Sequence, residues 1–257
     1  MLSQAEKGGV QNTIQNCVTV LQNDPILADS IRLNLLSERI DIVKPMGWQR
    51  SGPTLTDTDM MYILRRMEKY GLYSEKRVSA AIRIVANENH YHPIRDYLNK
   101  LKWDGTARIN RALHRFLGAA EDELTTEALK IFLLGAIKRV FHPGCKFEMM
   151  LCLVGGQGAG KSSFFRLLAI KDEWFSDDLR RLDDDNVFRK LQGHWIMEMS
   201  EMIATANAKS IEEIKSFLSK QKETYKIPYE THPADRLRQC VFAGTTNRQD
   251  FLPRDRT

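Results

Sequence analysis

Apolar residues recur at helical spacing through the first half of the chain. Thr56 and Asp59 form a capping-box-like pattern, and Gly71 ends the stretch that follows. Within that stretch the apolar residues stand three and four positions apart, at Met60, Ile63, Leu64 and Met67. The spacing predicts a helix there. Three more helices are predicted: after Ser74, with Val78, Ile82 and Val85 on one face, over 93–102, and over 123–141.

The second half of the chain has a different pattern. Short apolar runs occur at Phe147–Val154, Trp195–Met197 and Cys240–Ala243, and their length is typical of buried strands. Helical patterns over 163–170 and 211–220 separate them. Because alternating strands and helices favour a parallel sheet covered on both faces, we predict an α/β core over residues 119–257. Residues 1–118 are predicted to form a mainly helical accessory region.

Length and composition restrict the class of protein. At about 150 residues per domain, a 257-residue chain holds one large domain or two modest ones. Hydrophobic residues make up 42% and charged residues 28%, which excludes wholesale disorder and fibrous classes. The four cysteines form no C-x-x-C motif and are expected to be reduced. No apolar run reaches a membrane span of about 18 residues and no signal-peptide pattern begins the chain, so we expect a cytoplasmic protein.

A glycine-rich segment directly follows the first predicted strand. Its sequence, GGQGAGKS, satisfies every fixed position of the phosphate-loop motif G-x-x-x-x-G-K-[ST]. Glycines let backbone amides turn inward around phosphate oxygens, and the following helix adds its positive end. The nucleotide-binding residues are therefore predicted to be Gly155, Gly156, Gln157, Gly158, Ala159, Gly160, Lys161, Ser162 and Ser163. Lys161 is expected to reach the β- and γ-phosphates of ATP, and Ser162 to ligate Mg²⁺.

Polar residues follow the other two predicted strands. Glu198 ends the second strand and is the predicted acid on the metal side, while Glu201 is a candidate for activating water. Glu201 could instead only cap the end of the strand. Asn247 ends the third strand, where it could contact the γ-phosphate or orient water, although Asn is also common in turns.

A basic segment lies between the second and third strands. It alternates aromatic and basic residues and is predicted to form a β-hairpin that binds DNA. The candidate DNA-binding residues are Lys222, Lys226, Arg236 and Arg238. The alternative is a solvated hairpin whose charges contact only water. The net charge of +5 permits a polyanionic partner without requiring one.

Several longer blocks resemble the virulence-associated E family, which comprises ATPases of bacteriophages, prophages and mobile islands. The blocks are residues 23–34, 91–109, 142–163, 174–179, 198–202, 214–229 and 238–247. They include YHPIRDYLNKLKWDG, GGQGAGKSS, EMSEM and RQCVFAGTTN. The family is similar to superfamily 3 helicases, which are replication proteins with an AAA+-like P-loop core. The resemblance implies that Gly155–Ser163 bind ATP, that Glu198 belongs to the acidic strand motif and that Asn247 is the sensor.

The sequence departs from the family pattern in two places. Family members often have Arg where Lys226 stands, so the charge is kept but bidentate phosphate geometry is not. After the sensor, the family pattern continues through arginines that reach a neighbouring subunit's ATP site, whereas this sequence stops at Arg254–Thr257. We therefore expect a core without its arginine finger, and weak intrinsic ATPase activity.

Three functions are compatible with these features. The leading hypothesis is an ATP-dependent replication ATPase and DNA helicase that acts on single-stranded DNA as a homo-oligomeric ring in a bacterial host cell. The second is a non-motor ATP-binding module that recruits replication proteins. The third is a small-molecule P-loop kinase, which is disfavoured because the sequence suggests no lid or second substrate pocket. No membrane partner is expected.

Overall fold

A computed structural model describes residues 2–4, 8–179, 182, 187–200, 208–225 and 234–248. The chain divides into two compact units, Met1–Tyr97 and Leu98–Thr257. This division lies upstream of the boundary expected between residues 118 and 119. The difference has a physical cause. Helix α5 (Ile109–Leu117) packs on α6 (Glu123–Phe141), and Arg111 forms a 3.0 Å ion pair with Glu121, so residues 98–118 belong to the second unit.

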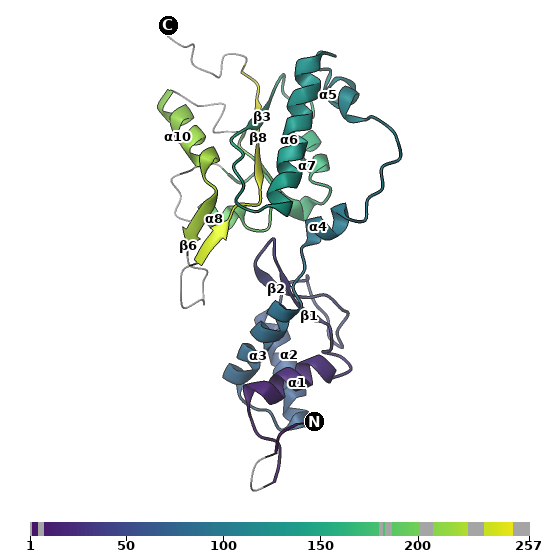
Figure 1. The fold of residues 1–257 in the computed structure, drawn as a ribbon, viewed down its shortest axis with the longest axis vertical. Helices are drawn as coiled ribbons and strands as arrows, with labels where there is room; N and C mark the ends of the chain where they lie inside the picture. Colours follow the sequence, from purple (N-terminus) through teal and green to yellow (C-terminus); the bar gives the residue numbers. More distant parts are fainter. Residues whose placement is uncertain are drawn as a thin grey trace. The chain divides into compact units, whose positions relative to one another are not determined.

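The first unit combines three main helices with a two-stranded antiparallel sheet (Figure 1). Its helices are α1 (Ile14–Asn23), α2 (Asp57–Met67) and α3 (Glu75–Glu88), with the 3-10 turn η1 (Glu68–Tyr70) after α2. Strands β1 (Ile31–Asn34) and β2 (Arg39–Ile42) pair in the register Ile31 with Ile42. The predicted capping box at Thr56 and the helix after Ser74 are confirmed.

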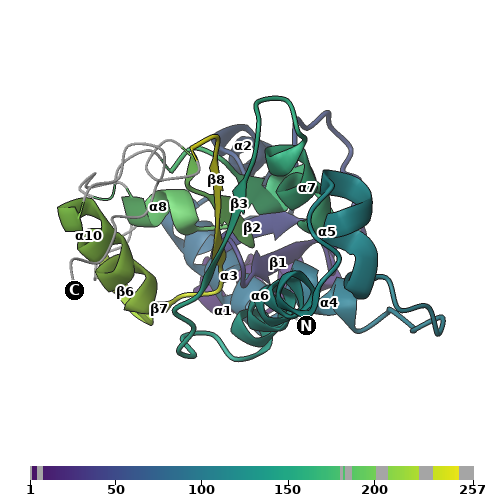
Figure 2. The same ribbon diagram turned by 90° about the horizontal axis from the view of Figure 1, so that it is seen from above.

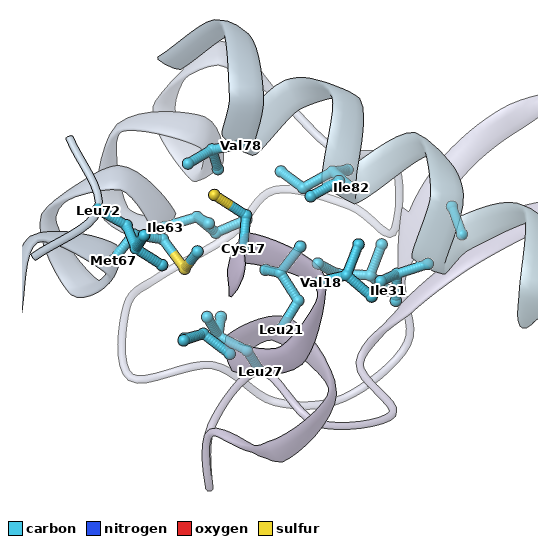
Figure 3. Packing of buried hydrophobic residues seen from close by; sticks show 14 of the residues in the cluster. Cys17, Val18, Leu21, Leu27, Ile31, Ile63, Met67, Leu72, Val78 and Ile82 are labelled. Atoms are coloured by element: carbon cyan, nitrogen blue, oxygen red, sulfur yellow. The ribbon is translucent and has the colours of Figure 1, made fainter. Parts of the chain in front are cut away.

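Apolar residues from all three helices meet in one buried cluster (Figure 3). Cys17 and Leu21 of α1 lie against Ile63 of α2 and Val78 of α3, and each of these side chains is fully buried. Burial also raises the pKa of the Cys17 thiol, which keeps it protonated. The helical spacing read from the sequence therefore marks the face of each helix that forms this core.

The second unit is built around a four-stranded parallel sheet of order β3-β8-β5-β4. The strands are β3 (Met150–Val154), β8 (Val241–Thr246), β5 (Ile196–Glu198) and β4 (Phe175–Ser176). The predicted α/β class with an open parallel sheet is confirmed. Because all four strands run the same way, their carboxyl ends meet at one edge of the sheet.

Helices cover both faces of this sheet (Figure 2). On one face, α8 (Val187–Leu191) and α10 (Ala208–Ser219) pack against Met197 and Phe242. On the other face lie α6 and α7 (Lys161–Leu168), where Phe132 of α6 contacts Phe165 of α7 with ring centroids 5.7 Å apart. Since side chains alternate along a strand, Glu198, Ala243 and Thr245 lie on the face of α7.

Helix α6 holds the residues that precede three of the strands. Arg139 is fully buried and donates to the carbonyl of Phe147 at 2.7 Å and to that of Cys240 at 3.1 Å, just before β3 and β8. Trp195, which precedes β5, donates its indole N–H to the carbonyl of Ala136 at 3.0 Å. These three bonds tie the strand starts to one rigid helix.

Element ends differ from the sequence expectation by a few residues. The helix predicted over 93–102 is only α4 (Pro93–Leu98), which is followed by turn and coil. The strand predicted from Phe147 begins at Met150, and the Phe147 carbonyl accepts from Arg139. The sequence reasoning named neither α1 nor α5, nor the pair β1 and β2.

A buried carboxylate links two elements of the first unit. Asp24 follows α1 and accepts hydrogen bonds from Arg66 and from the Tyr70 hydroxyl, and also from the amides of Ile26 and Leu27. Burial of the carboxyl raises its pKa, but these hydrogen bonds outweigh that effect and hold the pKa at about 2. The ionised form therefore stabilises the folded unit.

Asp24→Asn is expected to lower the free energy of unfolding by about 2 kcal/mol at neutral pH. Because the folded-state pKa lies below the unfolded value of about 3.9, this contribution is full above about pH 5 and disappears as the pH falls towards 2. Urea unfolding of wild type and variant from pH 7 to pH 3 measures it. Asp29→Asn, at an exposed pair with Lys44, is the control and should change little. A difference that grows with acidity would contradict the assignment.

Candidate functional site

The glycine-rich segment forms the turn between β3 and α7. Gly158 and Gly160 both have a φ of +80°, a left-handed conformation that favours glycine. Gly160 is the residue before the first helical position and offers no side chain to cap it. The first-turn amides of α7 are therefore left without a side-chain acceptor, at the positive end of the helix. This arrangement suits an anion.

Lys161 lies across this turn. Its ammonium group donates to the carbonyls of Gly155 at 2.7 Å and Gly156 at 2.8 Å, and to Oδ1 of Asn247 at 2.9 Å. Asn247 directly follows β8, so this contact joins two of the sequence-predicted site residues across 86 positions of the chain. The cation sits where it can exchange these three acceptors for an incoming anion.

Glu198 ends β5 and is almost fully buried, with 1% of its surface exposed. Its Oε1 accepts hydrogen bonds from Ser162 Oγ at 2.7 Å and from the hydroxyl of Thr245. Its Oε2 is also buried and has no hydrogen-bond partner among the described residues. A buried carboxylate oxygen without a partner is costly, so Oε2 is a candidate ligand-binding atom.

A pocket of about 470 Å³ opens at this edge of the sheet. Its walls come from the glycine-rich turn and from the residues that end or follow the strands: residues 157–163, Ser200, Thr245, Thr246 and Asn247. The oxygens of Ser162 and Glu198 fit a hard cation such as Mg²⁺, which binds through few protein oxygens together with phosphate. Among the described residues no group of three His, Cys, Asp or Glu forms a metal-binding cluster.

The sequence reasoning missed Thr245, Thr246 and Ser200 as residues of this site. Thr245 is 5% exposed and reaches Glu198 from the neighbouring strand. The only available signal was its place in the run that ends at Asn247, because strand neighbours cannot be read from a sequence in which 47 residues separate the two partners.

The predicted basic hairpin is present as the antiparallel pair β6 (Lys222–Tyr225) and β7 (Ala234–Leu237), with Lys222 opposite Leu237. Lys222 is exposed and forms an ion pair with Asp235. Arg236 is partly buried, and burial lowers its pKa. Lys226 lies outside the described residues. The two strands thus present fewer available cations than the sequence suggested.

The structure contradicts the assignment of Arg238 to the DNA-binding set. Arg238 is 3% exposed and forms an ion pair with Glu223 inside the protein. Its guanidinium lies 4.6 Å from the ring centroid of Phe217 and 5.2 Å from that of Phe242. The charge is satisfied in the core, because it joins α10, β6 and β8, and it is not available to a phosphate.

Two other expectations concern residues that the structure does not describe, namely Glu201 and the arginines at 254 and 256.

The cysteines are described and all are free, as predicted. Burial raises the pKa of Cys152, on β3 beneath the site, to about 11. This thiol therefore stays protonated at neutral pH and is no nucleophile.

Comparison with known proteins identifies the family. A family model described as the virulence-associated protein E-like domain matches residues 98–257. The chain belongs to this family. The matched residues coincide with the second compact unit, including the whole site. No curated protein matches the chain significantly.

Solved structures show a similar fold. Apo structures of the NrS-1 C-terminal region match with TM-scores of 0.53 and 0.55, each at 15% identity. They cover 90% and 96% of this chain. At this identity the likeness concerns the fold alone, and the chain spans only 56% and 59% of those structures. Over the described residues no helix is long and apolar enough to cross a membrane.

The turn geometry leads to a prediction for its glycines. Gly158→Ala should lower the free energy of unfolding of the second unit by about 1 kcal/mol, because alanine is strained at a φ of +80°. Gly156→Ala is the matched control, since Gly156 has no positive φ and both added methyl groups would meet open space. Thermal unfolding of the two variants measures the difference. Equal stability would contradict the left-handed conformation at Gly158.

Proposed function

We propose that this protein is an ATP-dependent replication ATPase, a DNA helicase motor of a bacteriophage, prophage or mobile genetic island. The observation that carries this proposal is the convergence of Lys161, Ser162, Glu198 and Asn247 at one edge of the parallel sheet. A cation and an uncapped helix start in one pocket, with a buried carboxylate bonded to the pocket residue Ser162, suit the binding and hydrolysis of a nucleoside triphosphate. Membership of the virulence-associated protein E-like family supports the same conclusion.

Each residue has a role in this proposal. The amides of the glycine-rich turn and of the first turn of α7 bind the phosphates. Lys161 leaves its carbonyl acceptors and pairs with the β- and γ-phosphates. Asn247, released from Lys161 by the same exchange, is placed to contact the γ-phosphate or to orient water. Glu201 remains the candidate for activating water.

Ser162 and Glu198 are the residues that would hold Mg²⁺. When bound, Mg²⁺ would neutralise the charge on the transferred phosphate. The Ser162 hydroxyl can keep its hydrogen bond to Glu198 and still offer a lone pair, because a hydroxyl is both donor and acceptor. The unpartnered Oε2 of Glu198 is the oxygen that remains for the cation or its water.

DNA is the proposed second partner, and single-stranded DNA would be gripped by the hairpin of β6 and β7. With Arg238 in the core, the proposed contacts reduce to Lys222, Lys226 and Arg236. A homo-oligomeric ring would supply the cation that completes each ATP site. The smaller basic surface leaves the second function open, an ATP-binding module that recruits replication proteins without moving on DNA.

Two substitutions should separate nucleotide binding from hydrolysis. Lys161→Ala is expected to weaken ATP binding by about ten- to a hundredfold, because it removes charge-assisted bonds to phosphate. Glu198→Gln should keep ATP binding but stop hydrolysis, since the neutral amide cannot assist the metal or the water. Calorimetry and phosphate release measure the two effects. Lys171→Ala, at an exposed pair with Glu173, is the control for Lys161. Unchanged affinity of Lys161→Ala would refute the phosphate loop.

A second experiment separates the helicase motor from the non-motor ATP-binding module. The double variant Lys222→Ala/Lys226→Ala should weaken binding of an oligo(dT) strand and reduce the salt slope by about 0.7 for each lost phosphate contact. Oligo(dT) should also stimulate ATP hydrolysis by the wild type. Lys130→Ala/Lys171→Ala removes two exposed lysines that are paired with glutamates outside the hairpin and is the control. DNA binding that does not depend on salt, together with ATP hydrolysis that oligo(dT) does not stimulate, would favour the non-motor ATP-binding module.

A further inference from the structure

Thr245 is a buried residue whose side chain reaches into the site from the central strand. It lies on β8, which pairs with β3 on one side and with β5 on the other. In this register Glu198 is opposite Ala243, so Thr245 stands two residues further along the same face. The residue is 5% exposed, and its hydroxyl donates to Oε1 of Glu198.

The hydrogen bonds on Glu198 are unequal. Ser162 and Thr245 both donate to Oε1, whereas Oε2 has no partner within the described part of the chain although it is buried. A carboxylate can rotate about its last bond, and rotation would exchange the two oxygens. Two donors that converge on one oxygen fix the plane of the group, because a partial turn would leave both donors unsatisfied, whereas a half-turn only exchanges two equivalent oxygens.

The two donors differ in how firmly they are held. Ser162 is exposed, and it belongs to the glycine-rich turn and α7, where a nucleotide would bind. Thr245 lies on β8, where it pairs with Leu153 of β3, and its branched side chain restricts its rotamers. The Thr245 bond can therefore persist while Ser162 adjusts to a ligand.

We infer that Thr245 is a positioning residue that holds Oε1 of Glu198 and thereby presents Oε2 to the metal and water of a bound nucleotide. This inference rests on the proposed function and adds to it a residue that acts through Glu198. Thr245 touches neither phosphate nor metal in this role. Its hydroxyl matters more than its methyl group, because only the hydroxyl can donate.

Two variants separate the hydroxyl from the shape of the side chain. Thr245→Val keeps the size and branching but removes the donor, and Thr245→Ser keeps the donor but removes the methyl group. We expect Thr245→Val to lower kcat by about tenfold or more, with little change in KM, because the loss concerns a hydrogen bond to a charged group. Thr245→Ser is expected to retain most of kcat.

A binding measurement gives a readout that does not depend on turnover. Calorimetric titration with ADP, with and without Mg²⁺, gives the factor by which Mg²⁺ strengthens nucleotide binding. This factor should shrink in Thr245→Val and be restored in Thr245→Ser, while the affinity without Mg²⁺ stays the same in all three proteins. Thermal unfolding of each protein shows whether it is folded. If Thr245→Val does not fold, the comparison of Thr245→Ser with the wild type remains.

The outcomes distinguish this inference from the proposed function. If the wild type binds ADP with a clear Mg²⁺ effect and Thr245→Val behaves in the same way, Thr245 has no positioning role and the proposed function stands. A serine variant as impaired as the valine variant would also overturn the inference, because it would assign the effect to packing. If the wild type binds no nucleotide, both proposals fail.

Discussion

The alignment of three parallel strands by side-chain bonds to one helix, α6, is the constraint on which the rest of the second unit depends. Arg139 of α6 binds the carbonyls that precede β3 and β8, and Trp195 ties the start of β5 to the same helix. A buried guanidinium has to find acceptors, since leaving it unbonded would cost several kcal/mol. Its two carbonyls are therefore held firmly. With the starts aligned and the strands paired in parallel, the carboxyl ends are brought to one edge.

The site follows from that alignment. The glycine-rich turn continues β3, Glu198 ends β5, and Thr245 and Asn247 lie at the end of β8. At the end of β8, Thr245 donates to Glu198 of the neighbouring strand β5, and Asn247, which follows β8, accepts from Lys161 at the start of α7. The end of β8 thus contacts both the cationic and the acidic residues of the site.

The charge of a residue was the least reliable predictor of its place in the site. Arg238 and Lys222 stand in the same basic segment, yet one is enclosed by Phe217, Phe242 and Glu223 and the other is exposed beside Asp235. Nothing in the local sequence separates them. Whether a basic residue faces solvent depends on which element covers it, and α10 covers Arg238 from another part of the chain. Motif spacing was more reliable, because the glycine pattern around Lys161 reflects local backbone conformation that neighbours in sequence decide.

The sequence by itself determined the elements whose cause is local. These include the capping box at Thr56, the helix over 123–141, the α/β alternation and the phosphate-loop motif. Tertiary structure alone decided the strand order β3-β8-β5-β4, the division after Tyr97 and the partners of Glu198. The physical reason is that hydrogen-bonding periodicity and turn conformation act over a few residues. Strand pairing and burial join residues that lie tens of positions apart, such as Glu198 and Thr245.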